Sequence, residues 1–142
     1  MAAPIRLPKP LVSGDSVAVV AASSCLEGEG ALARLDAGIA ILESWGLVVE
    51  RKPLRSWGYL AGNDQERSAD LRPERLGEEP AISLLACMRG GWGSARLLER
   101  PLAMGPTWLL GFSDVTSLLW AQVARGHGGA IHGPLLTSLA GE

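Results

Sequence analysis

Short apolar segments recur along the chain and alternate with stretches in which apolar residues are more widely spaced. The segment at residues 16–22 (SVAVVAA) is apolar almost throughout, which is typical of a strand buried on both faces of a sheet. Four further segments have the length and composition of strands. The sequence therefore predicts strands over Ser16–Ala22, Leu47–Glu50, Ile82–Cys87, Thr107–Gly111 and Ala130–His132.

The residues between these segments show helical spacing. Leu32, Leu35, Ile39 and Leu42 recur at steps of three and four, which predicts a helix that ends at Gly46. Three other helices are expected from their apolar spacing and their terminal residues. They are a polar helix from the capping pair Asn63 and Glu66 to about Leu76 before Pro80, a short helix Ala95–Glu99 capped by Ser94 and stopped by Pro101, and a helix Ser113–Arg125 ended by Gly126.

Strands that alternate with helices predict an α/β domain with a parallel sheet and helices on both faces. The first ten residues, which contain three prolines, are expected to be an extended lead-in. In such a sheet the ligand crevice lies beyond the carboxyl ends of the strands. Candidate site residues are therefore expected in four loops, at residues 23–30, 57–62, 89–93 and 111–114.

The composition places the chain among single globular domains. Its 142 residues include 47% hydrophobic and 20% charged residues, and its net charge of −2 offers no basic surface for nucleic acid. No apolar run is long enough for a membrane span, and the first residues do not resemble a signal peptide. Cys25 and Cys87 have no metal-site or disulfide-framework spacing. We therefore expect a cytoplasmic protein with no membrane or nucleic-acid partner.

The segment Gly111–Thr116 (GFSDVT) carries the most specific candidate chemistry. Ser113 stands between a buried strand and an amphipathic helix, as the serine of a nucleophile elbow does. The N–H of Asp114, at the start of the helix, could stabilise a developing oxyanion. Val115 stands where the usual elbow has a second glycine. The alternative is that Ser113 only caps the helix.

The glycine-rich turn Arg89–Gly93 directly follows a predicted strand. Its backbone N–H groups could supply a second oxyanion donor or bind a carboxylate or phosphate. The alternative is a plain turn that uses glycine at positive φ. Because parallel strands share one carboxyl edge, the turn is expected beside Ser113.

A dinucleotide-binding fingerprint is a competing interpretation. Residues 28–33 (GEGALA) match G-x-G-x-x-A, and Glu50 follows at the spacing of the ribose-binding acid. Five residues separate Gly28 from the expected end of the preceding strand, whereas the fingerprint begins directly after the strand.

The remaining candidates are two histidines and two tryptophans. His132 is expected near the crevice, where it could contact a ligand or act as a base for Ser113, whereas a structural role is the alternative for it and for His127. Neither histidine has a partner at metal-ligand spacing, so no metal site is expected. Trp57 and Trp92 lie in crevice loops and are the tryptophans expected to touch substrate.

Five stretches, taken in order, resemble the N-terminal domain of the LD-carboxypeptidase family, which includes microcin C immunity peptidases. They are Leu11–Ser23 (LVSGDSVAVVAAS), Tyr59–Leu71 (YLAGNDQERSADL), Arg89–Gly93 (RGGWG), Gly111–Thr116 (GFSDVT) and His132–Pro134 (HGP). The resemblance covers nearly the whole chain. Trp92 stands where tyrosine or phenylalanine is more familiar in the family.

The resemblance implies a three-layer domain of the flavodoxin or glutamine-amidotransferase type, with residues 1–142 as the nucleophile-bearing N-terminal domain. It implies a cytoplasmic serine peptidase that releases D-alanine from muropeptide tetrapeptides during peptidoglycan recycling. Ser113 would be the nucleophile, and the backbone N–H groups of Asp114 and Gly91 would be the oxyanion donors. No cofactor is implied.

In the family a C-terminal domain supplies the glutamate and histidine of the catalytic triad, and the full-length proteins form homodimers. That second domain is expected to lie outside these 142 residues, so neither His132 nor His127 is assigned as the base. The substrate stays open between a muropeptide and a peptide amide of the aminoacyl-nucleotide type. A nucleotide-binding module and a non-catalytic relic that only binds muropeptide or a partner are the remaining alternatives.

Overall fold

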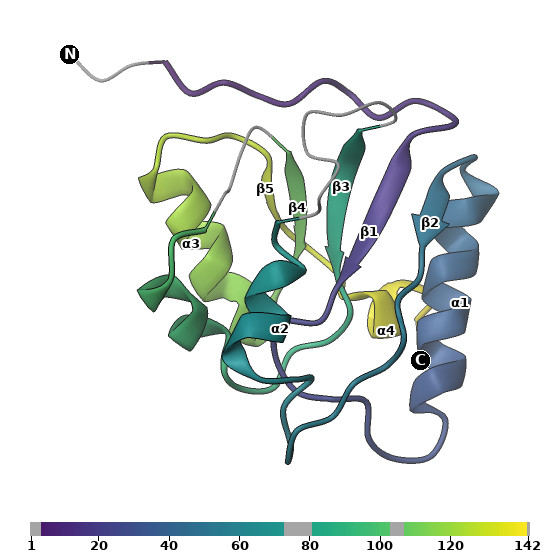
Figure 1. Cartoon of the computed structure of the whole chain (residues 1–142). Helices are drawn as coiled ribbons and strands as arrows, with labels where there is room; N and C mark the ends of the chain where they lie inside the picture. Colours follow the sequence, from purple (N-terminus) through teal and green to yellow (C-terminus); the bar gives the residue numbers. More distant parts are fainter. Residues whose placement is uncertain (1–3, 73–80, 103–106, 142) are drawn as a thin grey trace.

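The computed structural model describes residues 4–72, 81–102 and 107–141. These residues form one sheet in which all neighbouring strands are parallel, in the order β2-β1-β3-β4-β5 (Figure 1). The strands are β1 (Ser16–Val20), β2 (Val48–Glu50), β3 (Ile82–Cys87), β4 (Trp108–Gly111) and β5 (Ala130–His132). The predicted α/β class is confirmed, and the topological switch point lies between β1 and β3.

Helices cover both faces of the sheet. On one face lie α1 (Ala31–Ser44) and α4 (Leu136–Leu139) (Figure 1). The other face carries α2 (Asp64–Ala69), the 3₁₀ helices η1 (Ser94–Glu99) and η2 (Ser113–Val115), and α3 (Thr116–Ala124). In the described part of the chain no helix has the length and apolar character needed to cross a membrane.

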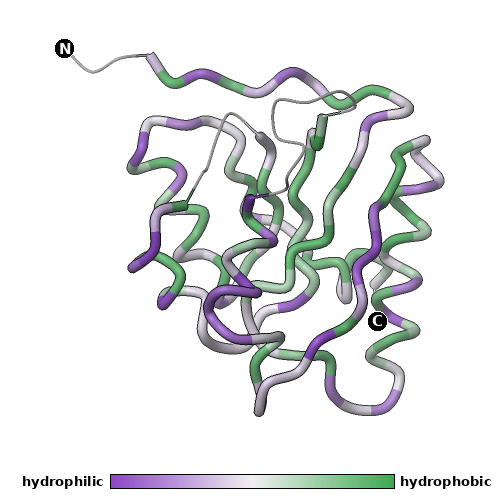
Figure 2. Tube along the Cα trace, viewed as in Figure 1, coloured by the Kyte–Doolittle hydropathy of each residue, from purple (hydrophilic) through white to green (hydrophobic). Residues whose placement is uncertain are grey.

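Strand β1 is buried on both faces, as its sequence predicts. Val17 and Val19 pack in the core beneath α1, whereas Ala18 and Val20 pack in the core beneath α3. Figure 2 shows the strands as hydrophobic segments enclosed by more polar loops and helices. The strand thus separates two hydrophobic cores.

The predicted ends of two elements are wrong. β1 ends at Val20 and not at Ala22, and α2 ends at Ala69 and not near Leu76. After α2 the chain turns so that Leu71 becomes fully buried in the core beneath α3. Tertiary packing therefore overrides the polar helix pattern, and residues 73–80 lie outside the described part.

Two helix predictions also need correction. The segment 94–99 is a 3₁₀ helix whose N-cap is Gly93, so Ser94 is its first residue and not its cap. The helix predicted over residues 113–125 divides into η2 and α3. Hydrophobic spacing alone could not reveal this division, because it reports which face is buried and not the backbone angle of each residue.

Both long helices end as the glycine signals predict. At the end of α1, Gly46 has φ 86° and its N–H donates to Glu43, while Leu47 donates to Leu42. This pair of bonds is the Schellman motif. Gly126 ends α3 in the same way, with bonds from Gly126 to Val123 and from His127 to Gln122.

Helix α4 was not predicted, because four residues carry no readable period. It lies so close to α1 that a side chain at Gly38 would overlap the carbonyl group of Leu136. This close approach holds Leu135 and Thr137 at the carboxyl edge of the sheet.

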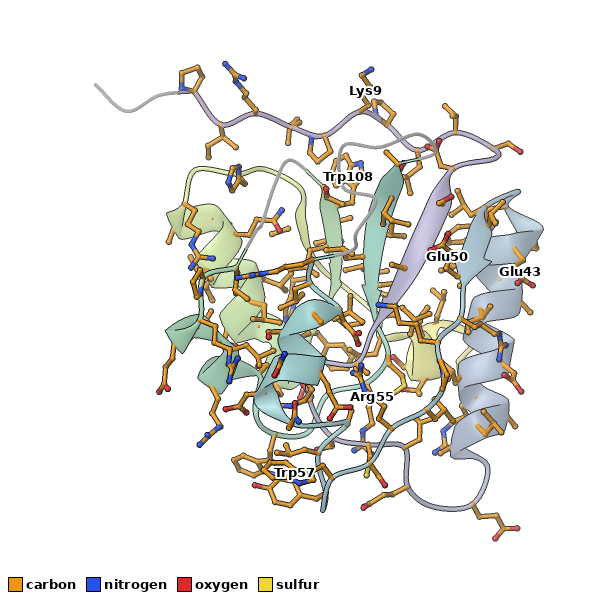
Figure 3. The ribbon with its side chains drawn as sticks, viewed as in Figure 1. Lys9, Glu43, Glu50, Arg55, Trp57 and Trp108 are labelled. Carbon is orange, nitrogen blue, oxygen red and sulfur yellow. The ribbon has the colours of Figure 1, made fainter. Side chains whose placement is uncertain are left out.

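The N-terminal segment runs along the opposite edge of the sheet (Figure 1). Gly128 donates to the carbonyl of Arg6, and the indole N–H of Trp108 donates to the carbonyl of Lys9 at 2.8 Å (Figure 3). The segment therefore covers the amino ends of the strands, and the carboxyl ends remain the edge at which loops form a pocket.

Candidate active site

A pocket of about 340 Å³ opens at the carboxyl edge of the sheet. The loops after β1, β3, β4 and β5 and the start of α1 contribute to its wall. It is lined by Leu26, Glu27, Ala31, Arg34, Arg89, Gly90, Gly91, Phe112, Ser113, Leu135 and Thr137. The pocket thus brings the predicted nucleophile and the glycine turn together.

Ser113 is the first residue of η2, in the sharp turn that follows β4. Its φ is 63°, and it is the one residue other than glycine with positive φ in the described ranges. Left-handed backbone of this kind costs free energy in a residue with a side chain, and such strain is typical of functional sites. Ser113 makes no capping hydrogen bond at η2 or α3, so the helix-cap alternative is wrong.

Two glycines give this turn its space. A Cβ atom at Gly111 would collide with Val115 and Cys87, which confirms that the strand passes close to the helix there. A Cβ at Gly90 would lie 3.1 Å from the Ser113 hydroxyl oxygen and 3.6 Å from the Asp114 nitrogen. Gly90 does not have a positive φ, so a glycine is required there by the close approach of Ser113 and not by the backbone conformation. Sequence reasoning identified the turn but not this contact.

Gly91 directly follows, with φ 113°, and a side chain there would overlap Ser24. The Ser24 hydroxyl accepts the N–H of Trp92 at 3.1 Å. Among the described residues, the N–H of Gly91 makes no hydrogen bond to another group. Gly91 therefore offers a free donor on the pocket wall, as an oxyanion hole requires.

The Asp114 carboxylate joins the elbow to two other loops. It accepts a 2.6 Å hydrogen bond from the Ser23 hydroxyl, after β1, and a 3.0 Å bond from the Ser94 N–H, after the glycine turn. The Ser94 hydroxyl also donates to the Asp114 carbonyl at 2.6 Å. These bonds fix the elbow relative to the glycine turn. The sequence had suggested only the backbone N–H of Asp114.

Arg67 is fully buried beneath these loops. Its guanidinium donates to the carbonyls of Ala22 and Gly93 at 2.8 Å each and to the carbonyl of Gly62 at 3.0 Å. It also pairs with Asp64 at 2.6 Å. Arg67 thus connects the loop after β1 to the glycine turn. It lies within the Tyr59–Leu71 stretch, but nothing in the local pattern distinguishes it from a surface arginine.

Two carboxylates complete the polar layer. Asp64 also binds Arg96 at 2.9 Å, and the hydrogen bond from Arg96 is the main cause that holds the pKa of Asp64 below its ordinary value. Asp70 is almost fully buried and accepts hydrogen bonds from the Ala21 N–H and from Arg55, which is labelled in Figure 3. Both carboxylates therefore support the site loops.

Neither histidine lines the pocket. His132 pairs with Gly111 across the sheet, and its ring meets Phe112 edge to face at 6.2 Å between centroids. Phe112 lines the pocket, but His132 does not. His127 forms a bridge to Arg6 at the opposite edge of the sheet. Neither histidine is therefore placed as a base for Ser113.

Trp57 and Trp92 are exposed and lie outside the pocket lining. Trp57 belongs to a tight turn, with reciprocal backbone bonds to Leu60, at the carboxyl edge of the sheet (Figure 3). Their role as substrate contacts stays a prediction.

The nucleotide fingerprint lacks its required geometry. Gly28 lies eight residues beyond Val20, the last residue of β1 (28 − 20 = 8), so the glycines of the fingerprint do not form the tight turn directly after the strand.

The two cysteines are free and buried, and burial raises the pKa of the Cys87 thiol to about 12. In the described part of the chain, no three potential ligands gather at one point as a metal site would require.

Comparison with known proteins gives a consistent set of relatives. The family model of the LD-carboxypeptidase N-terminal domain matches residues 17–133. A proposed carboxypeptidase of Synechocystis sp., slr1534, is 43% identical over 95% of this chain and 44% of its own length. The murein tetrapeptide carboxypeptidase of Pseudomonas aeruginosa is 41% identical over 57% of this chain and 27% of its own length.

A solved structure gives the same fold. The microcin C7 self immunity protein MccF, in complex with aspartyl sulfamoyl adenosine, matches with a TM-score of 0.75 and 25% identity, over 93% of this chain and 40% of that chain. The chain therefore spans less than half of the length of these three proteins.

Arg67→Met should lower the free energy of unfolding by about 3–5 kcal/mol, because it leaves three backbone carbonyls beneath the loops without their donor and removes one of the two arginines that bind Asp64. Urea denaturation followed by circular dichroism measures the loss. Arg96→Met is the matched control, since Arg96 binds the same Asp64 but is 65% exposed, and it should cost about 1 kcal/mol or less. Equal losses in the two variants would contradict the role of Arg67.

Ser113→Gly should be more stable than Ser113→Ala by about 1 kcal/mol, because glycine adopts positive φ without strain. The same pair of substitutions at Ser56, an exposed residue without positive φ, should show the opposite order. Urea denaturation of the four variants provides the measurement. An alanine variant at 113 as stable as the glycine variant would show that the elbow is not strained.

Proposed function

Because the chain belongs to the LD-carboxypeptidase family, through that family's N-terminal domain, we propose that it supplies the nucleophile and oxyanion hole of a serine peptidase. The proposed reaction hydrolyses the L-D peptide bond of a muropeptide tetrapeptide and releases the terminal D-alanine, as a step of peptidoglycan recycling in the cytoplasm. The name of the Pseudomonas relative supports a murein tetrapeptide as the substrate.

One observation carries the proposal. Ser113 has positive φ, lies on the pocket wall, and has Gly90 directly beside its hydroxyl. A strained turn from strand to helix is the geometry that exposes a nucleophilic serine. A serine that only caps a helix or lies on the surface requires neither a positive φ nor a glycine beside its hydroxyl.

In the proposed reaction the Ser113 oxygen attacks the scissile carbonyl carbon while a general base takes its proton. The carbonyl oxygen becomes an oxyanion, which accepts hydrogen bonds from the N–H groups of Asp114 and Gly91. The C–N bond then breaks, and the D-alanine amine leaves with a proton from the base. Water hydrolyses the resulting ester and restores the serine.

The described pocket lining contains no histidine that could serve as the general base. His132 packs on Phe112. The family resemblance assigns the base to a histidine, with a glutamate, in a second domain. A serine without its base is a weak nucleophile, so we expect the 142-residue chain alone to be nearly inactive. Binding and the oxyanion donors would leave only residual catalysis.

A second substrate type is an aminoacyl-nucleotide amide, since MccF has been solved with aspartyl sulfamoyl adenosine. Both substrates present a carbonyl next to nitrogen, so the roles of Ser113, Asp114 and Gly91 are the same. A homodimer of the full-length protein is also part of the proposal.

Covalent labelling with a fluorophosphonate tests the nucleophile. Labelling of the 142-residue chain should be slow, and fusion to the C-terminal portion of the Synechocystis relative should accelerate it by roughly 100-fold or more, because that portion brings the base. Intact mass and peptide mapping should place the label on Ser113. Ser113→Ala should abolish labelling, and Ser56→Ala should not change it.

A label on another residue, or one that survives Ser113→Ala, would refute the assignment. Turnover of a muropeptide by the 142-residue chain, lost in both Ser113→Ala and His132→Ala, would instead show that the chain carries its own base.

A further inference from the structure

Two arginines line the same pocket as Ser113. Arg34 comes from the first turns of α1, and Arg89 comes from the glycine turn after β3. The two residues therefore line one cavity from elements that are far apart in the sequence. Glu27 is the carboxylate that lines the same wall, so the wall carries a net positive charge.

Neither arginine has a carboxylate partner within 4 Å in the described part of the chain, although others do. Arg51, Arg55, Arg67 and Arg96 each form an ion pair with an aspartate. Arg89 instead donates one N–H to the carbonyl of Cys25 at 2.8 Å, which orients it and leaves its other donors available. Among the described residues, the guanidinium of Arg34 makes a single long hydrogen bond, at 3.5 Å to the carbonyl of Glu29.

The position of Arg34 is unfavourable unless an anion binds beside it. It is the fourth residue of α1. The first turn of this helix contains no acidic residue, and its N-cap is Gly30, which has no side chain to cap the helix. The start of a helix carries partial positive charge, so a cation there is destabilising. Such a local conflict is typical of functional sites.

We propose that Arg34 and Arg89 form the subsite that binds the terminal carboxylate of the peptide substrate. The inference rests on the proposed function, because removal of a single C-terminal residue places that carboxylate one residue away from the carbonyl that Ser113 attacks. A guanidinium group matches a carboxylate with two parallel hydrogen bonds. The subsite would select peptides that end one residue beyond the scissile bond and reject longer or amidated ones.

Binding can be measured without turnover, on the 142-residue chain itself. N-acetyl-D-alanine carries the terminal carboxylate, and N-acetyl-D-alanine amide is the matched uncharged probe. In ¹H–¹⁵N spectra the acid should cause saturable shifts at the glycine turn 89–91 and at the start of α1. The amide should bind about tenfold or more weakly, since it loses a charge-assisted pair of hydrogen bonds.

Arg34→Gln and Arg89→Lys should each reduce the preference for the acid over the amide, and Arg100→Gln should leave it unchanged. Arg100 is an exposed arginine outside the pocket lining, so it controls for lost charge. Arg89→Lys keeps the charge and tests the two-pronged geometry, and Arg34→Gln tests the second cation without altering the bond to Cys25.

Equal binding of acid and amide, no saturable binding of the acid, or a preference that survives both substitutions would overturn the inference. Tighter binding of inorganic phosphate than of the acid at these residues would assign the pair to a phosphate group, and would also overturn it. None of these results depends on labelling of Ser113. A failed subsite would therefore leave the nucleophile assignment standing, and loss of the nucleophile would not abolish carboxylate binding.

Discussion

A buried guanidinium holds together the loops that carry the candidate active site. Burial of a charge is costly unless its hydrogen bonds are satisfied. Arg67 meets this condition through three backbone carbonyls and Asp64, and those carbonyls belong to the loop after β1, the loop before α2 and the glycine turn. Because each partner is needed to satisfy the charge, the positions of these loops depend on one another.

The strained serine depends on this frame. With the loops held, Ser23 and Ser94 can present donors to Asp114, and Asp114 in turn fixes the turn that contains Ser113. A positive φ at a residue with a side chain persists only where its surroundings over-determine it. The polar layer beneath the pocket therefore explains how Ser113 keeps this conformation on the pocket wall, next to Gly90 and the free N–H of Gly91. It would also hold the backbone N–H groups of Asp114 and Gly91, the proposed oxyanion donors, in place before substrate binds, as electrostatic catalysis requires.

Much of the framework could be predicted from sequence because it depends on local signals. Hydrophobic runs located all five strands, the capping pair Asn63 and Glu66 located the start of α2, and Gly46 and Gly126 located two helix ends. The support of the site could not be predicted, because it depends on contacts between distant segments. Asp114 meets Ser23 across 91 positions, and Arg67 meets Ala22 across 45. No local pattern marks such pairs.

The most direct test of the account is a crystal structure of the chain with a phosphonyl group bound to Ser113 by the fluorophosphonate. The account predicts that the phosphonyl oxygen lies about 2.7–3.1 Å from the backbone nitrogens of both Asp114 and Gly91, as expected for an oxyanion hole. It also predicts that Ser113 keeps its positive φ. A phosphonyl oxygen that points into solvent, with neither nitrogen within hydrogen-bond distance, would contradict the account.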